Sequence, residues 1–225
     1  MSISLDWDRN FPKGYGHTSI AFLKRCYGFY QAKNGDFDSA QDVVSKCIKQ
    51  NRLLELRKQY PNAVLIPVLG QNQLPLALAY EIGLPIWFNV YFIYIVSRKL
   101  LCAIQRLLHK TIFTGYIEKN TEYILFDDII TQGGTILALR NFVISMGGIV
   151  VAVVALAYAI GSQNIAPLKK YTIMLFLKFG NRLVQLLKIC GIAVSFQELT
   201  NSQVKYLNRF VSFENIIIKI AKSNS

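Results

Sequence analysis

Two adjacent carboxylates stand just before a glycine turn in YILFDDIITQGGT, the stretch from Tyr123 to Thr135. Ionised carboxylates accept hydrogen bonds and cannot donate them, so Asp127 and Asp128 suit a ligand that carries neighbouring hydroxyl groups. The turn that follows suits the opposite chemistry, because free backbone amides and the positive end of a helix dipole attract a phosphate. Together the two parts predict a site for a ligand that carries both hydroxyl groups and a phosphate. The alternative is that the acids only end a strand in water and the glycines only form a turn.

The surrounding pattern predicts the elements that position these groups. The four apolar residues from Tyr123 to Phe126 are typical of a buried parallel strand, which would deliver the acids to one edge of a sheet. Gly133 and Gly134 interrupt the pattern where the backbone must bend tightly. From Thr135 onward, apolar residues recur at helical spacing, at positions 136, 139, 143 and 144. The motif is therefore expected at a junction of strand, loop and helix.

This stretch resembles the phosphoribosyl pyrophosphate (PRPP) motif of type I phosphoribosyltransferases, in which apolar residues, two acids and two further residues precede a Thr and Gly loop. The resemblance implies that Asp127 and Asp128 hold the ribose 2′ and 3′ hydroxyls. Mg²⁺ is the implied cofactor, held through PRPP and water near these two acids and by no direct protein site. The implied contacts to the 5′-phosphate come from the loop, at Thr131, Gln132, Gly133, Gly134 and Thr135.

A second strand, short glycine loop and helix precede the motif. The run Ala63 to Leu69 reads AVLIPVL and leads into Gly70, Gln71 and Asn72, and Pro75 and Gly83 mark the two ends of the helix. In phosphoribosyltransferases the loop at the matching place grips pyrophosphate. The resemblance therefore implies pyrophosphate contacts by Leu69, Gly70, Gln71 and Asn72. Further candidates are Arg98 and Lys99, in a basic amphipathic stretch from Ser97 to Lys110 for which a solvated basic face is the alternative.

These units predict an α/β protein with a mostly parallel central sheet flanked by helices, the Rossmann-like fold that the resemblance to type I phosphoribosyltransferases implies, with helical additions at both ends. Residues 61–162 are expected to form the phosphoribosyltransferase-like core, including a strand from Ile149 to Ala157. Residues 1–60 are expected to form a helical hood, with one helix running from Asp38 or Ser39 toward Lys58. Residues 163–225 are expected to form a mainly helical extension packed on this core.

Hydrophobic residues make up 52% of the 225-residue chain, which excludes a disordered protein and raises the question of a membrane span. The apolar run from Phe142 to Ile160 has about the length of a spanning helix, but Gly147 and Gly148 divide it into a helix end and a strand. The first residues lack the features of a signal peptide. The four cysteines have no metal-like spacing and are typical of thiols in a reducing compartment. We therefore expect a cytoplasmic protein without a membrane partner.

Two functions fit these observations. The first is an enzyme, a PRPP-using pentosyltransferase that transfers ribose 5-phosphate to a small nitrogenous base with release of pyrophosphate. The alternative is a non-catalytic PRPP-binding or nucleotide-binding regulator on the same fold. Thr131 stands where transferases for 6-oxopurines usually carry an Asp, which argues against hypoxanthine or guanine as acceptor. The net charge of +12 favours polyanionic partners. A homodimer and nucleic-acid binding remain open, and no catalytic base is identified.

Overall fold

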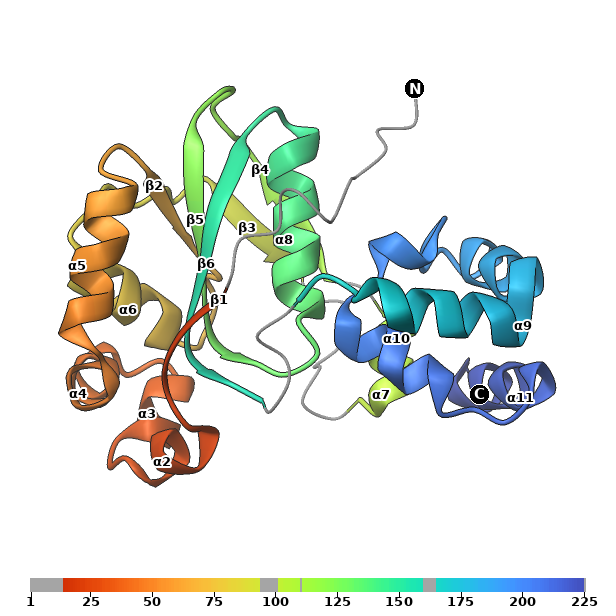
Figure 1. The fold of residues 1–225 in the computed structure, drawn as a ribbon. Helices are drawn as coiled ribbons and strands as arrows, with labels where there is room; N and C mark the ends of the chain where they lie inside the picture. Colours follow the sequence, from red (N-terminus) through yellow and green to blue (C-terminus); the bar gives the residue numbers. More distant parts are fainter. Residues whose placement is uncertain (1–13, 94–100, 110, 160–164, 225) are drawn as a thin grey trace.

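The computed structural model describes residues 14–93, 101–109, 111–159 and 165–224 (Figure 1). Strands and helices alternate through the first two thirds of the chain, and the last third is helical. The elements in order are β1 (Gly14–Thr18), α2 (Ile20–Arg25), α3 (Phe29–Lys33), α4 (Phe37–Cys47), α5 (Gln50–Gln59), β2 (Val64–Pro67), α6 (Leu74–Ile82), β3 (Val90–Ile93), α7 (Ala103–Leu108), β4 (Ile112–Gly115), β5 (Glu122–Ile130), α8 (Gly134–Ser145), β6 (Ile149–Tyr158), α9 (Lys169–Ile189), the 3₁₀ helix η2 (Phe196–Glu198), α10 (Asn201–Asn208) and α11 (Phe213–Asn224).

The central sheet has four strands in the order β1-β6-β5-β2, and every neighbouring pair is parallel. β3 and β4 form a separate antiparallel ribbon. The expected class, a mostly parallel sheet flanked by helices, is confirmed. The expectation that the first sixty residues would be helical is wrong in one respect, because β1 adds an edge strand beside β6. The sequence GYGHT gave little sign of this strand, since its two glycines obscure the alternation of side chains.

Alternate residues of the strands face two separate apolar layers. Phe126 and Val154 point to the face covered by α4, α5 and α6, where Val44, Leu53 and Leu78 are buried with them. Leu125 and Val153 point to the opposite face, which α8 and the β3–β4 ribbon cover. Figure 1 shows α4, α5 and α6 on one side of the sheet and α8 on the other. Parallel sheets need this double cover, and it explains why both faces of β5 and β6 are apolar.

The C-terminal helices have an apolar cluster of their own. Leu175, Leu183 and Val204 are buried there together with Ile104 and Leu107 of α7, so α7 belongs to this helical group. Thr200 caps α10, and its side chain accepts a hydrogen bond from the backbone N–H of Gln203. In Figure 1 this group lies beyond α8, on the side away from α5 and α6. α9 changes direction at Gly180, which has a φ of 57°.

Several element boundaries differ from the expected ones. The helix expected from Asp38 or Ser39 toward Lys58 is two helices, because the backbone is extended at Ile48 between α4 and α5. β5 continues past both acids to Ile130, where pairing with β6 holds it. The described part of the run from Phe142 to Ile160, residues 142–159, contains the end of α8, a turn and β6, as the glycines suggest. None of the helices that the structure describes combines the length and the apolar character needed to cross a bilayer.

Candidate functional site

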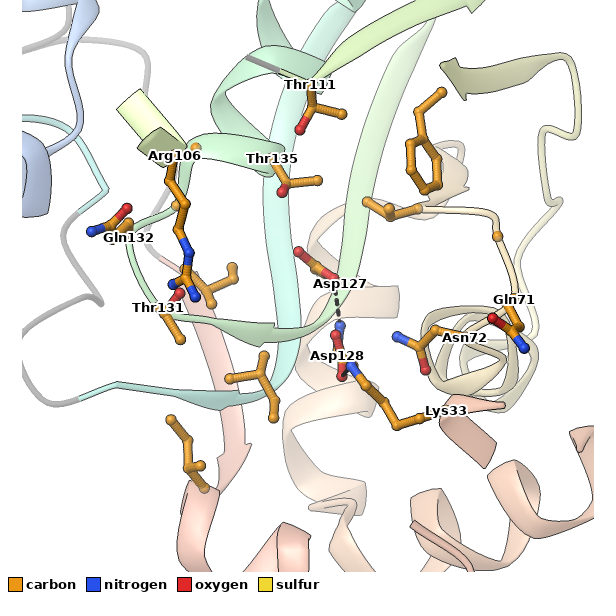
Figure 2. A pocket seen from close by; sticks show the side chains of 18 of the residues that line it. Lys33, Gln71, Asn72, Arg106, Thr111, Asp127, Asp128, Thr131, Gln132 and Thr135 are labelled. Carbon is orange, nitrogen blue, oxygen red and sulfur yellow. Dashed lines mark hydrogen bonds and ion pairs between the residues drawn. The ribbon is translucent and has the colours of Figure 1, made fainter. Parts of the chain in front are cut away.

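A cavity of about 700 Å³ opens where the carboxyl ends of β2 and β5 meet the first turn of α8. The residues after parallel strands converge at one edge of a sheet, and this edge is the usual ligand position in open α/β folds. Figure 2 shows the two acids near the middle of this cavity, with the loop after β5 on one side and the loop after β2 on the other. The structure thus brings the acids and both predicted anion loops to one space.

Asp127 and Asp128 lie side by side on β5 with different surroundings. Because successive residues of a strand face opposite ways, the two side chains leave the sheet on different faces. Asp127 is half-buried, and its Oδ1 accepts a hydrogen bond of 2.9 Å from the backbone N–H of Asp128. Burial, followed by the neighbouring Asp128 carboxylate, raises the pKa of Asp127 well above the usual value. The site therefore holds a carboxylate that is costly to ionise while no ligand compensates it.

Lys33, which the motifs in the sequence did not single out, forms an ion pair with Asp128. Its Nζ lies 2.5 Å from Asp128 Oδ2, and the side chains are 21% and 7% exposed respectively. Two hydrogen bonds join α3 to the loop after β2: Ala32 O accepts from Gln73 N at 3.0 Å, and Asn34 O accepts from the Gln71 side chain at 3.4 Å. This docking fixes the helix that carries Lys33. Nothing local in the sequence signals the pair, whose members are 95 residues apart.

The loop after β5 and the start of α8 form the proposed phosphate wall. Thr131, Gln132, Gly133, Gly134 and Thr135 all line the cavity. Gly133 has a left-handed backbone with a φ of 74°, no side chain caps the helix, and its first turn contains no acid. A Cβ on Gly133 would lie 3.0 Å from Ile165 Cγ2, so both the conformation and the packing favour glycine. The uncapped amides at this helix end suit an anion.

The opposite wall comes from the loop after β2. Gly70, Gln71 and Asn72 line the cavity, and Leu69 does not. Val68, the residue before Leu69, also lines the cavity, so Leu69 is the one position between Val68 and Asn72 that is missing from the wall. The pyrophosphate contact that the resemblance implies for Leu69 stays a prediction. Arg98 and Lys99, the other pyrophosphate candidates, lie outside the described residues.

Two further cations line the cavity, Lys24 at the end of α2 and Arg106 on α7. Figure 2 shows the Arg106 side chain reaching into the cavity on the same side as Thr131 and Gln132. Phe92 of the β3–β4 ribbon and Thr111 just before β4 add an apolar and a hydroxyl group. The segment containing Arg106 could be recognised as basic and amphipathic from the sequence. Which of its cations faces the site depends on how α7 packs against the C-terminal helices.

The carboxylates of Asp127 and Asp128 are the groups here that suit Mg²⁺, a cation that prefers oxygen ligands and usually keeps several waters. No group of three or more His, Cys, Asp or Glu side chains arranged to hold a metal ion occurs within the described ranges. The pair therefore fits a cation that a bound phosphate and water help to hold.

Comparisons with known proteins give distant matches. No family model matches the chain. It is 27% identical over 168 residues to Protein TraN of Escherichia coli, a match covering 70% of this chain and 38% of that protein. It is 26% identical over 150 residues to an uncharacterized protein of Haemophilus influenzae, covering 62% and 34% of the two chains. The matched segments thus span little more than a third of these curated relatives.

Solved structures also match the chain, three of them from enzymes of nucleotide metabolism. A purine phosphoribosyltransferase from Pyrococcus horikoshii has 16% identity and a TM-score of 0.34, with 65% of this chain and 78% of that chain covered. UMP synthase from Leishmania donovani has 15% identity and a TM-score of 0.34, with 71% and 32% covered. Adenine phosphoribosyltransferase from Thermoanaerobacter pseudethanolicus has 16% identity and a TM-score of 0.33, with 55% and 87% covered. Matches this distant assign neither an activity nor a substrate to this chain.

Proposed function

We propose that the protein binds PRPP and transfers its ribose 5-phosphate to a nitrogenous base, with release of pyrophosphate. One observation carries this proposal: a single cavity joins the Asp127–Asp128 pair, the uncapped end of α8 and the Gly70–Asn72 loop. PRPP offers what each part needs, since it has two ribose hydroxyls between a 5′-phosphate and a pyrophosphate. Hydrogen-bond acceptors face the middle of such a ligand, and donors face its two ends.

Each group has a role in this arrangement. The two carboxylates accept hydrogen bonds from the ribose hydroxyls, while the amides of α8 and the hydroxyl of Thr135 donate to the 5′-phosphate. Lys33 and Lys24 line the cavity from the N-terminal helices and supply positive charge for the pyrophosphate. The helix that carries Lys33 is docked on the Gly70–Asn72 loop. When bound, Mg²⁺ would neutralise part of the charge on the leaving pyrophosphate. The carboxylates thus position the sugar and do not attack it.

Calorimetry with PRPP, with and without Mg²⁺, tests the binding step. The variant is Asp127→Asn with Asp128→Asn, which keeps the side-chain size and removes both charges. We expect it to weaken PRPP binding at least about 100-fold, because each hydrogen bond to a charged group contributes about 1.5 to 3 kcal/mol. The matched control is Asp38→Asn with Asp42→Asn, which makes the same charge change on the exposed side of α4. Equal affinity in the two double variants would refute the proposed site.

A second candidate is a PRPP-binding regulator without turnover. One observation favours it: among the described residues that line the cavity, the only carboxylates are the two assigned to the ribose, and no histidine is present. The described wall thus offers no separate group to take a proton from an incoming base. Release of pyrophosphate over a panel of purine, pyrimidine and pyridine bases distinguishes the candidates. PRPP binding without pyrophosphate release for any base would support the regulator.

A further inference from the structure

We propose that the outer face of the first half of α9 binds the surface of an anionic lipid bilayer. This half has one face in the C-terminal apolar cluster, where Leu175 and Phe179 are buried. The opposite face carries large apolar side chains that no described part of the chain covers. Ile173 is 48% exposed, Met174 54%, Phe176 48% and Leu177 80%. Large apolar side chains on two opposite faces of one helix normally have a nonpolar environment on both faces.

The exposed side chains form a continuous stripe. At 100° per residue, Leu177 lies almost opposite the buried Thr172, Leu175 and Phe179, and Ile173 and Met174 lie on its two sides. The helix changes direction at Gly180, so the stripe belongs to one straight segment. This geometry allows the apolar side chains to enter a flat surface together.

Cations border the stripe. Lys169 and Lys178 lie on its opposite sides, and Lys170 lies at its N-terminal end, all three exposed. The two ion pairs found among the described residues involve none of them. Lys178 is instead held by a 3.0 Å hydrogen bond to the backbone oxygen of Asn208. Residues 165–224 contain nine Lys or Arg and two Glu, so an anionic partner complements the whole helical group.

The charges at the N-terminal end of α9 also favour contact with an anionic lipid surface. Two lysines occupy its first turn, no acid is present there, and Leu168 provides no side-chain cap. The positive end of the helix dipole repels cations, so this arrangement destabilises the isolated protein. Phosphate groups of lipids placed at this end would interact favourably with both the lysines and the uncapped amides. The same placement would put the apolar stripe at the level of the acyl chains.

A bilayer explains these features better than other partners do. Nucleic acid matches the lysines but offers phosphates where the aliphatic side chains point. A second copy would bring the same lysines together, and protein interfaces are generally depleted in Lys. Helices that lie in a membrane interface combine an apolar face with flanking lysines, whose aliphatic stems allow the ammonium groups to reach the headgroups. This contact lies at a bilayer surface and requires no spanning helix, although it departs from the expectation of no membrane partner.

Co-sedimentation of the full chain with vesicles tests the proposal. We expect binding to vesicles rich in phosphatidylglycerol and none to phosphatidylcholine vesicles. Leu177→Glu should weaken vesicle binding about tenfold or more, because the variant loses the apolar surface that leaves water on binding and places a negative charge against anionic headgroups. The control is Leu54→Glu, which makes the same change at a 54% exposed leucine on α5. Both variants should keep the far-ultraviolet circular dichroism and the PRPP affinity of the natural chain, so the result is independent of the proposed function.

Three results would overturn the proposal. The first is no binding to phosphatidylglycerol vesicles. The second is binding that Leu177→Glu and Leu54→Glu weaken equally or not at all, since charge alone would then explain it. The third is a dimer, detected by light scattering without lipid, that Leu177→Glu dissociates. In that case the stripe would be an interface between copies of this chain.

Discussion

The ion pair between Lys33 and Asp128 allows a quantitative test of how the N-terminal helices are tied to the sheet. Lys33→Met keeps the length and apolar stem of the side chain and removes its charge. It leaves the Asp128 carboxylate, in a residue only 5% exposed, without its cation. Loss of one partner from a fully buried pair costs about 3 to 5 kcal/mol, and exposed pairs contribute about 0 to 1 kcal/mol. Because the lysine is 21% exposed, we expect a loss of about 2 kcal/mol in unfolding free energy.

Urea unfolding at neutral pH measures this loss, and a double-mutant cycle assigns it to the pair. Asp128→Asn removes the carboxylate charge, and the double variant removes both partners, so an unpaired buried charge remains only in Lys33→Met. The double variant should therefore be more stable than Lys33→Met, with a coupling energy of about 1.5 to 3 kcal/mol. Lys24→Met provides a control on a lysine that lines the same cavity from an exposed position. A coupling energy near zero would refute the reasoning.

Three further predictions concern single side chains. Burial lowers the pKa of His17 to about 4 from an unfolded value of 6.5, so the unfolding free energy falls as the pH drops through this range and the unfolded chain takes up a proton more readily. In His17→Asn, urea unfolding should show a loss of free energy between pH 7 and pH 4 that is smaller by roughly 3 kcal/mol than in the natural chain. The raised pKa of Asp127 means that its ionised form destabilises the fold, so Asp127→Asn should raise the unfolding free energy by about 1 kcal/mol at pH 8 and by less at acidic pH. An equal gain at pH 8 and at acidic pH would show that ionisation of Asp127 is not the cause. A Cβ on Gly148 would lie 2.7 Å from Val143 Cγ1 and 2.8 Å from Ile117 Cγ2, so Gly148→Ala should lower the unfolding free energy by about 1 to 3 kcal/mol. An unchanged thermal midpoint would contradict this prediction, because it would show that these neighbours move freely.

The sequence predicts the interior of the sheet well and its edge poorly. β5 and β6 are long apolar runs bounded by glycines or acids, because strands buried on both faces contain few polar residues. β1 consists of Gly14, Tyr15, Gly16, His17 and Thr18, and its position depends on the existing edge of β6. A Cβ on Gly16 would lie 2.8 Å from the Tyr158 ring, a constraint that appears only when the two strands are placed together.

The site shows the same division between local and long-range information. The two acids and the loop from Thr131 to Thr135 lie within nine consecutive residues, so their chemistry can be read before the fold is known. Asn72 reaches the cavity because β2 pairs with β5. Lys33 reaches it because α3 docks on the loop after β2 through one bond between backbone groups and one from the side chain of Gln71. Contacts between segments this far apart in the chain leave no local residue pattern to find.

Features of the empty cavity lower the stability of the folded protein, and a bound ligand would remove this cost. Asp127 is held where ionisation is unfavourable, and α8 begins without a side-chain cap or an acid in its first turn. Both arrangements destabilise the empty protein, and each could be relieved by a single substitution without disturbing the core. A ligand with hydroxyl donors at its centre and anionic groups at its ends would relieve both at once. Separate structural explanations would be needed for each feature if the cavity bound nothing, so the costs support one common ligand.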